Sequence, residues 1–309
     1  MPEHIPVLLN EVLTGLRIKP NGIYIDATFG RGGHTRAILE QLGNEGKIVA
    51  IDRDPSAILA GQQAIKDVRL QLVHAEFSEL KRIAIEQKIV GQVDGILLDL
   101  GVSSPQLDDA SRGFSFMNNG PLDMRMNPSA GESAADWLAK VEEKVLADSL
   151  FLYGEERFAK RIAKAIIDAR EQQALTTTKQ LAEVIAKANP KWEHHKHPAT
   201  RSFQAIRIVV NDELGQIQQT LQHCAEVLTI GGRAAVISFH SLEDRIVKQF
   251  IQSQDKTKNL PRGLPLTKQQ LAQHQANLQK VGKAIKPSVR ELENNPRSRS
   301  AVLRIVEKI

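Results

Sequence analysis

A glycine-rich turn follows the first apolar segment of the chain and opens a helical pattern, with the residues Asp26-Ala27-Thr28-Phe29-Gly30-Arg31-Gly32-Gly33-His34. Glycines permit a tight turn and a close approach of the backbone to a ligand. The free N–H groups at the start of a helix favour an anion such as a carboxylate. Asp52 ends the second apolar segment, about 20 residues further on, where an acid can bind both hydroxyls of a ribose. This pattern predicts a nucleotide-type ligand at the turn.

The same turn suits a nicotinamide dinucleotide, S-adenosylmethionine or a purely structural role. The dinucleotide fingerprint needs a third glycine at position 35, and this chain has Thr35 there. Asp26, at the end of the strand, would repel a pyrophosphate, whereas it would attract the ammonium or sulfonium of S-adenosylmethionine. These details favour S-adenosylmethionine as the cofactor, bound in preference to NAD.

The elements that must position this turn alternate between strand and helix patterns. Four apolar strands are expected at 23–26, 47–52, 70–74 and 93–99, with helical patterns between them at 35–42 and near 55–65. Apolar strands that alternate with helices predict a parallel sheet covered on both faces and connected by right-handed crossovers. The expected fold class is α/β, with a doubly wound Rossmann-like sheet.

The alternation resumes late in the chain. A helix is expected at 211–228, ended by Gly231-Gly232, and a fifth strand at 233–239. A capping box at Ser241-Leu242-Glu243-Asp244 is expected to open another helix. One helix at 267–279 and a final strand at 301–306 complete the expected elements.

About a hundred residues separate the fourth strand from the helix at 211, far beyond a usual crossover of about 10–20 residues. Helical patterns fill this stretch, at 133–138, 142–152, 155–170 and 178–188. We therefore expect a cofactor-binding core formed by 1–106 and 209–309. An inserted helical subdomain at 107–208 is expected to recognise the substrate.

A set of ordered motifs extends over nearly the whole chain. They are the segments 29–34, 99–108, 113–116, 121–126, 153–156, 197–201 and 238–245. Together they closely resemble the bacterial 16S ribosomal RNA cytosine-N4 methyltransferase family, from His4 to Ile305. The resemblance implies a class I methyltransferase core with a helical insertion. It also implies a 16S rRNA substrate, a decoding-centre cytidine in the small ribosomal subunit.

The resemblance also implies a set of cofactor residues: Gly32, Gly33, His34, Asp52, Phe77, Asp99 and Gln106. The residue types agree with these roles. The ring of Phe77, just past the third strand, could pack on adenine, although an ordinary core aromatic is the alternative. The amide of Gln106 offers both a donor and an acceptor to a purine or ribose edge.

Methylation of an exocyclic amine needs neither a metal nor a covalent intermediate, so positioning and electrostatics carry it. Amino methyltransferases place an Asp, Asn or Ser before proline on the loop after the fourth strand. Ser103-Ser104-Pro105 is similar in outline, and Ser103 and Ser104 are the candidate catalytic residues. A Ser-Pro turn is the alternative for Ser104. Gln106 stands where an aromatic is usual, so base stacking would come from Phe114 or Phe116.

Histidines raise two further questions. His240, after the fifth strand, lies at the edge where ligands bind in such sheets, and it is either functional or a satisfied structural histidine. The cluster His194-His195-Lys196-His197 is not expected to bind metal, because adjacent histidines point apart and no Cys or spaced acid completes a site. A solvated or phosphate-facing loop is expected there.

Basic side chains gather in two places. Arg157, Lys160, Arg161 and Lys164 recur at helical spacing, opposite the apolar Ile162. This stripe either grips phosphate or is a solvated helix face. From Lys280 onward, eight Lys and Arg stand against three acids, a surplus equal to the +5 of the whole chain. A basic segment beside a neutral remainder suggests a polyanionic partner, with a solvated tail as the alternative.

Composition narrows the possibilities. No apolar run approaches the roughly 18 residues of a membrane span, and the N-terminus lacks the features of a secretory signal. The single cysteine, Cys224, excludes an internal disulfide. A cytoplasmic location without membrane partners is expected, and a homodimer is left open. A methyltransferase for another amine and an assembly factor with a vestigial pocket are the competing functions.

Overall fold

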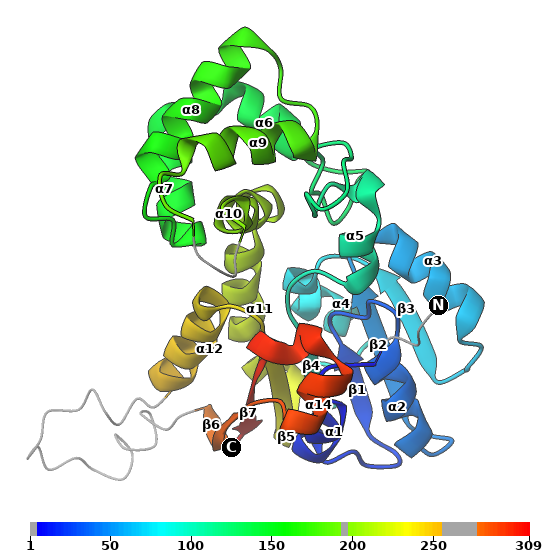
Figure 1. Ribbon diagram of the computed structural model, residues 1–309. Helices are drawn as coiled ribbons and strands as arrows, with labels where there is room; N and C mark the ends of the chain where they lie inside the picture. Colours follow the sequence, from blue (N-terminus) through cyan, green and yellow to red (C-terminus); the bar gives the residue numbers. More distant parts are fainter. Residues whose placement is uncertain (1–4, 193–196, 255–276) are drawn as a thin grey trace, which may run out of the picture. The chain divides into compact units, whose positions relative to one another are not determined.

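The computed structural model describes residues 5–192, 197–254 and 277–309. Two compact units make up the chain (Figure 1): one contains Met1–Gly101 and Leu214–Ile309, and the other contains Val102–Glu213. The first unit is built on a seven-stranded sheet with the order β3-β2-β1-β4-β5-β7-β6. The strands are β1 Ile23–Asp26, β2 Lys47–Asp52, β3 Leu70–His74, β4 Val93–Asp99, β5 Leu228–Ser238, β6 Leu278–Ile285 and β7 Val302–Lys308.

The first five strands are parallel, and β7 runs antiparallel between β5 and β6. Side chains alternate between the two faces of the sheet, as period-two strands require. Tyr24 packs on the side of Val12 and Ile38, whereas Ile25 packs on the side of Leu221. Both faces are therefore covered. The predicted doubly wound α/β sheet with an inserted helical unit is confirmed.

Helices connect and cover these strands. They are α1 Leu9–Leu16, α2 Gly33–Gln41, α3 Pro55–Ala64, α4 Leu80–Glu86, α11 Glu213–Val227, α12 Ser241–Gln254 and α14 Val289–Asn294. In α3, Pro55 occupies the first turn and the Asp54 side chain accepts the Ser56 N–H at 2.9 Å, so the helix begins where its cap fixes it. None of the helices in the described parts of the chain combines the length and apolar content that a membrane crossing requires.

Two expectations in the second half of the sheet were wrong. The helix expected at 211–228 is present as Glu213–Val227, but the next strand begins at Leu228 and not at 233, because Leu228 already pairs with Val93 of β4. Residues 278–279, expected to end a helix, begin β6, whose partner β7 supplies its hydrogen bonds. The rest of that expected helix lies outside the described residues, except Asn277.

The expected capping box at Ser241–Asp244 is shifted by one residue. Glu243 Oε2 accepts the N–H groups of Phe239 at 2.7 Å and His240 at 3.2 Å, so the reciprocal acid is Glu243. Asp244 is instead bound to the Arg304 guanidinium of β7, at 2.7 Å and 3.0 Å. This pair ties α12 to the sheet.

The second unit is helical. Its helices are α5 Ser104–Asp108, α6 Ala134–Lys140, α7 Glu143–Gly154, α8 Ala159–Gln172, α9 Thr178–Ala188 and α10 Ala199–Asn211. They enclose a separate apolar core that includes Leu146, Ile162 and Leu181. Asn211 fastens a loop to this core, because its side chain accepts the Met126 N–H at 2.8 Å and donates to the Met124 carbonyl at 2.7 Å.

Candidate ligand site at the sheet edge

The carboxyl ends of β1 and β4 lie side by side at the point where the strand order reverses, which is where open α/β sheets bind ligands. The Thr28 hydroxyl accepts the backbone N–H of Asp99 at 2.6 Å and so joins the loops after the two strands. The glycine turn leads from β1 directly into α2. The structure thus brings Gly32, Gly33, His34, Asp52 and Asp99 to one edge of the sheet, as the sequence predicted.

The glycines of the turn are required by the protein's own packing. Gly32 has φ of +72°, and a Cβ there would lie 2.7 Å from the Phe29 ring. A Cβ on Gly33 would lie 2.4 Å from Cγ of Pro6. The first-turn amides of α2 have no acceptor within the helix and remain available for an anion.

Asp52 is fixed in place by backbone donors. Its Oδ2 accepts the Gly30 N–H at 2.7 Å, and its Oδ1 accepts the Asp54 N–H at 2.8 Å. Burial raises the pKa of Asp52 to about 6, against the lowering effect of these two hydrogen bonds. Because a carboxylate oxygen has two lone pairs, Asp52 can still accept from the paired hydroxyls of a ribose.

Asp26 faces into the turn. It is only 1% exposed, and its oxygens accept the Thr35 hydroxyl at 2.6 Å and the Thr28 N–H at 3.2 Å. Burial raises the pKa of Asp26 to about 6, opposed by these hydrogen bonds. The sequence suggested that Asp26 attracts a cationic ligand. Because Asp26 is enclosed in this way, it can act on such a ligand only through its charge and not by direct contact. Thr35, where a dinucleotide fingerprint has glycine, holds this carboxylate.

Asp99 is the carboxylate that can meet a ligand. Its Oδ1 is buried and accepts no hydrogen bond from the described residues. Burial raises the pKa of Asp99 to about 8, and the negative charges of Asp26 and Glu243 contribute further. A cation placed at Oδ1 would relieve this concentration of acidic groups.

His34 connects this carboxylate to the N-terminal segment. The ring is 6% exposed, with Nε2 3.0 Å from the Val7 carbonyl oxygen and Nδ1 3.7 Å from Oδ2 of Asp99. The side chain of His34 is therefore clamped, so its backbone amide is the group that a ligand can reach. Phe77 begins a short 3-10 turn after β3 and stays partly exposed at the border of the core, as a stacking ring requires.

The loop after β4 continues into the second unit. Ser103 precedes α5, and its N–H is accepted by Oε1 of Gln106 at 3.0 Å, in a capping box. The carbonyl end of Gln106 is therefore engaged in holding the helix start. Ser104 is the first residue of α5. These three residues belong to the helical unit and not to the sheet edge that holds Asp99.

His240 lies beside a buried carboxylate. Its ring is 12% exposed, and Nδ1 has no hydrogen-bond partner among the described residues. Nε2 lies 3.1 Å from Oε1 of Glu243, which is fully buried. Because β5 lies next to β4, this pair stands at the same edge of the sheet as Asp99. Sequence reasoning missed the role of Glu243, although its position three residues after His240 was a signal.

The aromatic candidates of the second unit differ in availability. Phe114 is 7% exposed and belongs to the core, so it offers no stacking face. Phe116 already contacts two rings: a tilted His197, with ring centroids 4.6 Å apart, and Phe203 edge-to-face at 4.9 Å. Trp192 is 62% exposed, with its ring 5.9 Å from that of His197. Of the histidine cluster, 194–196 lie outside the described residues.

The sequence matches a known family over its full length: the profile of the MraW methylase family covers residues 1–309. Three solved structures are also similar. An rRNA methylase from Streptococcus thermophilus is 11% identical, with 98% of this chain and 92% of that one covered and a TM-score of 0.40. A Clostridium thermocellum protein classed with the rRNA methylases is 12% identical, with 99% and 100% covered and a TM-score of 0.45. A Streptococcus mutans protein in complex with SAH is 14% identical, with 99% and 100% covered and a TM-score of 0.41.

Proposed function

The chain belongs to the MraW methylase family, and from this premise we propose how its residues carry out the family's reaction. That reaction is the S-adenosylmethionine-dependent methylation of a cytidine N4 in 16S rRNA. The strand order 3-2-1-4-5-7-6 is typical of class I methyltransferases. The observation that carries the proposal is the buried Oδ1 of Asp99, which has no hydrogen-bond partner among the described residues, near the start of α2.

The sheet edge suits each part of the cofactor. Asp99 would hold the ammonium of the methionine group, and the first-turn amides of α2, at Gly33 and His34 after the Gly32 cap, would hold its carboxylate. Asp52 would accept the ribose hydroxyls, and Phe77 would pack on adenine. Gln106 belongs to the helical unit, and its part in cofactor binding stays a prediction. An NAD pyrophosphate would meet the same acidic groups unfavourably.

Replacing Asp52 with alanine should weaken cofactor binding by about 1.5–3 kcal/mol, the scale of a lost hydrogen bond to a charged group. Calorimetric titration with S-adenosylmethionine measures the loss, and NAD serves as the negative control ligand. Asp67→Ala is the matched variant, because Asp67 follows α3 in the same unit and binds only Arg69. Unchanged cofactor affinity in the Asp52 variant would exclude Asp52 from the ribose site.

S-adenosylmethionine supplies a sulfonium methyl group as the electrophile. Cytosine N4 is a poor nucleophile, because its lone pair is delocalised into the ring. Acceptors aimed at the amine hydrogens localise that lone pair as the new bond forms. We assign this role to the Ser104 hydroxyl and the adjacent Ser103-Ser104 backbone, five residues after Asp99 in the chain.

The methylated amine must also lose a proton, and the His240–Glu243 pair can accept it. In the tautomer that carries its proton on Nε2, His240 donates this N–H toward Oε1 of Glu243. Nδ1 is then an unprotonated nitrogen that has no hydrogen-bond partner among the described residues and can accept a proton. Glu243 keeps its own orientation, because its other oxygen is bound to two backbone amides. His240 would therefore act as the general base, with Glu243 as its positioning residue.

The product identifies the reaction. Incubation with labelled cofactor and small ribosomal subunits should give nucleosides that carry the methyl group on cytosine N4, as measured by mass spectrometry. A 5-methyl product would contradict the proposal. Carbon-5 methylation normally uses a cysteine nucleophile, and Cys224 is fully buried in α11, where burial raises the pKa of its thiol to about 12. RNA binding without any methylation would instead favour an assembly factor.

The helical unit would hold RNA through a basic surface. On α8, Lys160, Arg161 and Lys164 are exposed on the side opposite the buried Ile162 and Ile166, while Arg157 lies in the turn before the helix. Lys164 is 3.2 Å from Asp168, so it is partly neutralised. Within 277–309, Arg304 and Lys308 are bound inside the protein, at Asp244 and at the Leu228 carbonyl. Part of the expected basic tail therefore belongs to strands β6 and β7, and its exposed cations begin at Lys280.

Reversing the charges of Arg157, Lys160, Arg161 and Lys164 together should weaken RNA binding. The slope of log affinity against log salt should fall by about 0.7–0.9 for each lost phosphate contact. Cofactor affinity should hardly change, since salt screens surface charges beyond about 10 Å. Filter binding at several salt concentrations measures both effects. Wild-type RNA affinity and slope would show that the stripe is only a solvated face.

Three finer expectations remain proposals. The core at 1–106 and 209–309 would bind the cofactor, and 107–208 would recognise the 16S rRNA. A cytoplasmic location follows from the ribosomal substrate. Whether the protein forms a homodimer can be tested by measuring its molar mass in solution by analytical ultracentrifugation.

A further inference from the structure

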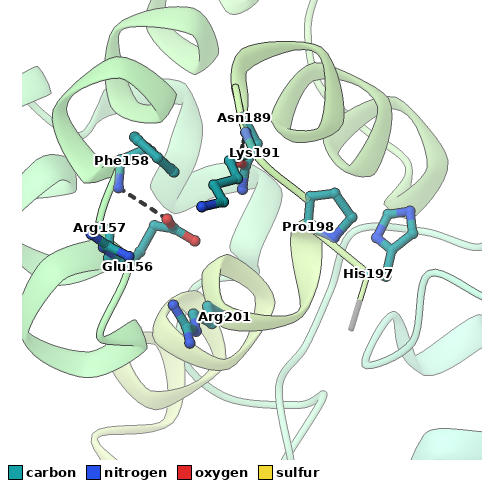
Figure 2. Close-up of a pocket in the computed structure, with 8 residues that line it drawn as sticks. All are labelled: Glu156, Arg157, Phe158, Asn189, Lys191, His197, Pro198 and Arg201. Atoms are coloured by element: carbon teal, nitrogen blue, oxygen red, sulfur yellow. Dashed lines mark hydrogen bonds between the residues drawn. The ribbon is translucent and has the colours of Figure 1, made fainter. Parts of the chain in front are cut away.

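The helical unit contains a basic hollow that lies outside the cofactor site. It has a volume of about 80 Å³ and is lined by Glu156, Arg157, Phe158, Asn189, Lys191, His197, Pro198 and Arg201. These residues come from the turn between α7 and α8 and from the connection between α9 and α10, extended by the first turn of α10 (Figure 2). Three lining residues carry a permanent positive charge, and only one is acidic. The hollow is therefore suited to an anion.

Two helix starts reinforce this charge. α8 and α10 contain 14 and 13 residues, and both begin at residues that line the hollow, with Phe158 and Pro198 as their N-caps. Neither N-cap has a side-chain hydrogen bond. The positive ends of two helix dipoles thus add to the charges of Arg157 and Lys191. Neither of these two side chains forms an ion pair with another described residue.

The acidic residue gives the site a second chemical preference. Glu156 is 3% exposed, and one of its oxygens, Oε1, accepts the Phe158 N–H at 3.0 Å. Figure 2 shows its carboxylate reaching into the hollow, with Lys191 above it and Arg201 below it. A carboxylate in this position repels a bare phosphate but accepts a hydrogen bond from a hydroxyl group next to one. A 2′-hydroxyl of RNA has this chemistry, and DNA lacks it.

A stacking surface lies beside the hollow. The His197 ring lines it, and the exposed Trp192 ring lies 5.9 Å from that ring. Cations that track a backbone next to an exposed aromatic ring are the usual elements of single-strand binding, in which base stacking contributes about 1–3 kcal/mol per base. The hollow is large enough for a phosphate and a ribose edge, while a base would remain outside, within reach of Trp192.

We propose that this hollow is a subsite for one nucleotide of single-stranded RNA, apart from the methylated cytidine. Arg157, Lys191 and Arg201 hold the phosphate, Glu156 accepts the 2′-hydroxyl, and Trp192 with His197 stacks the base. The proposal rests on the rRNA substrate of the proposed function. It adds an anchor that selects RNA over DNA through one carboxylate.

Trp192 provides a local signal for the test. The chain has two tryptophans, so in a Trp137→Phe background the fluorescence reports only Trp192. The probe is an oligouridine of about ten nucleotides, compared with its 2′-deoxy equivalent and with inorganic phosphate. RNA should quench the fluorescence at lower concentrations than DNA, and phosphate alone should not quench it.

Matched variants assign the contacts. Arg157→Gln with Lys191→Gln should weaken RNA binding about tenfold or more and lower its salt slope by about 1.4, for two contacts to a single strand. Lys179→Gln with Lys187→Gln removes the same charge from α9 outside the hollow and should leave the quenching nearly unchanged. Glu156→Gln should reduce the preference for RNA over DNA, because a neutral amide is a weaker acceptor for the 2′-hydroxyl.

The outcomes separate this proposal from the proposed function. Calorimetry with S-adenosylmethionine and methylation of small subunits report the function, and the fluorescence titrations report the subsite. Equal quenching by RNA and DNA, or an unchanged RNA affinity in the Arg157/Lys191 variant, would overturn the subsite even if methylation proceeds. An absence of methylation with RNA-selective quenching would overturn the function and keep the subsite.

Discussion

The Asp99→Asn variant is expected to be more stable than the wild type without cofactor and to lose cofactor binding. Asp99 is a carboxyl whose pKa is raised to about 8 by burial and by Asp26 and Glu243, and its Oδ1 lacks a partner among the described residues. A neutral amide removes the cost of charging this group, a gain on the order of 1–3 kcal/mol near pH 8. The same change removes the charge that holds an ammonium, so cofactor affinity should fall by about a hundredfold or more.

The pH dependence has a definite sign. The folded protein keeps the Asp99 proton up to about pH 8, whereas the unfolded chain releases it near the ordinary pKa of 3.8. Folding therefore takes up a proton between these values, and the stability of the cofactor-free protein falls as pH rises through this window. Cofactor binding favours the charged carboxylate, so affinity should rise with pH up to about 8 and binding should release a proton.

Thermal unfolding and calorimetry in buffers of different ionisation enthalpy measure these effects. Asp94→Asn is the matched control, because Asp94 is the second residue of the same strand but is bound to Lys19 at 2.6 Å and to the Ile23 N–H at 3.0 Å. That change should destabilise the protein and leave cofactor affinity intact. An Asp99→Asn variant that loses stability, or that binds cofactor as the wild type does, would contradict the role of Asp99.

The His240→Ala variant is expected to lower kcat by about 10²–10⁴-fold, the usual contribution of a general base. The affinity for S-adenosylmethionine should remain nearly unchanged, because no cofactor contact is assigned to His240. Glu243→Gln should give a smaller loss, since the amide oxygen can still accept the backbone N–H groups of Phe239 and His240 while the ring loses its charged neighbour.

Two controls distinguish catalysis from a structural effect. His223→Ala removes an imidazole on α11 that contacts Glu226 and should leave kcat unchanged. Imidazole added to the His240→Ala enzyme should restore part of the activity, which a folding defect would not allow. Unaltered kcat at saturating RNA and cofactor would exclude His240 as the proton acceptor.

The sequence predicted some elements to the residue, and the reasons are physical. Strands β1 to β4 are apolar runs bounded by Gly, Asp or charged residues, so both their type and their limits were readable. β6 was missed because it lies at the edge of the sheet and exposes most of its side chains, which removes the apolar signal. α10 was missed although its buried Phe203 and Ile206 recur at helical spacing, because the helix start at His197-Pro198 resembled a loop.

At the site, sequence and structure differ in what each residue does. The positions of Asp52 and Asp99 followed from the ends of β2 and β4. That Asp26 is enclosed by Thr35 and Thr28 depends on side-chain orientation, which spacing does not determine. The Glu243 contact with His240 depends on the start of α12 at Ser241, which puts His240 just before the first turn that contains Glu243.

The placement of the helical unit between β4 and β5 also affects the order of folding. These two strands are neighbours in the sheet, but about 110 residues of the second unit separate them along the chain. Closing a flexible loop of that length costs about 4 kcal/mol of chain entropy. The second unit has its own core, so it can become compact before the sheet closes and shorten the effective loop. We therefore expect destabilising substitutions at Leu146 or Ile162 to slow refolding of the sheet itself, which makes the inserted unit an internal folding aid for the domain that it interrupts.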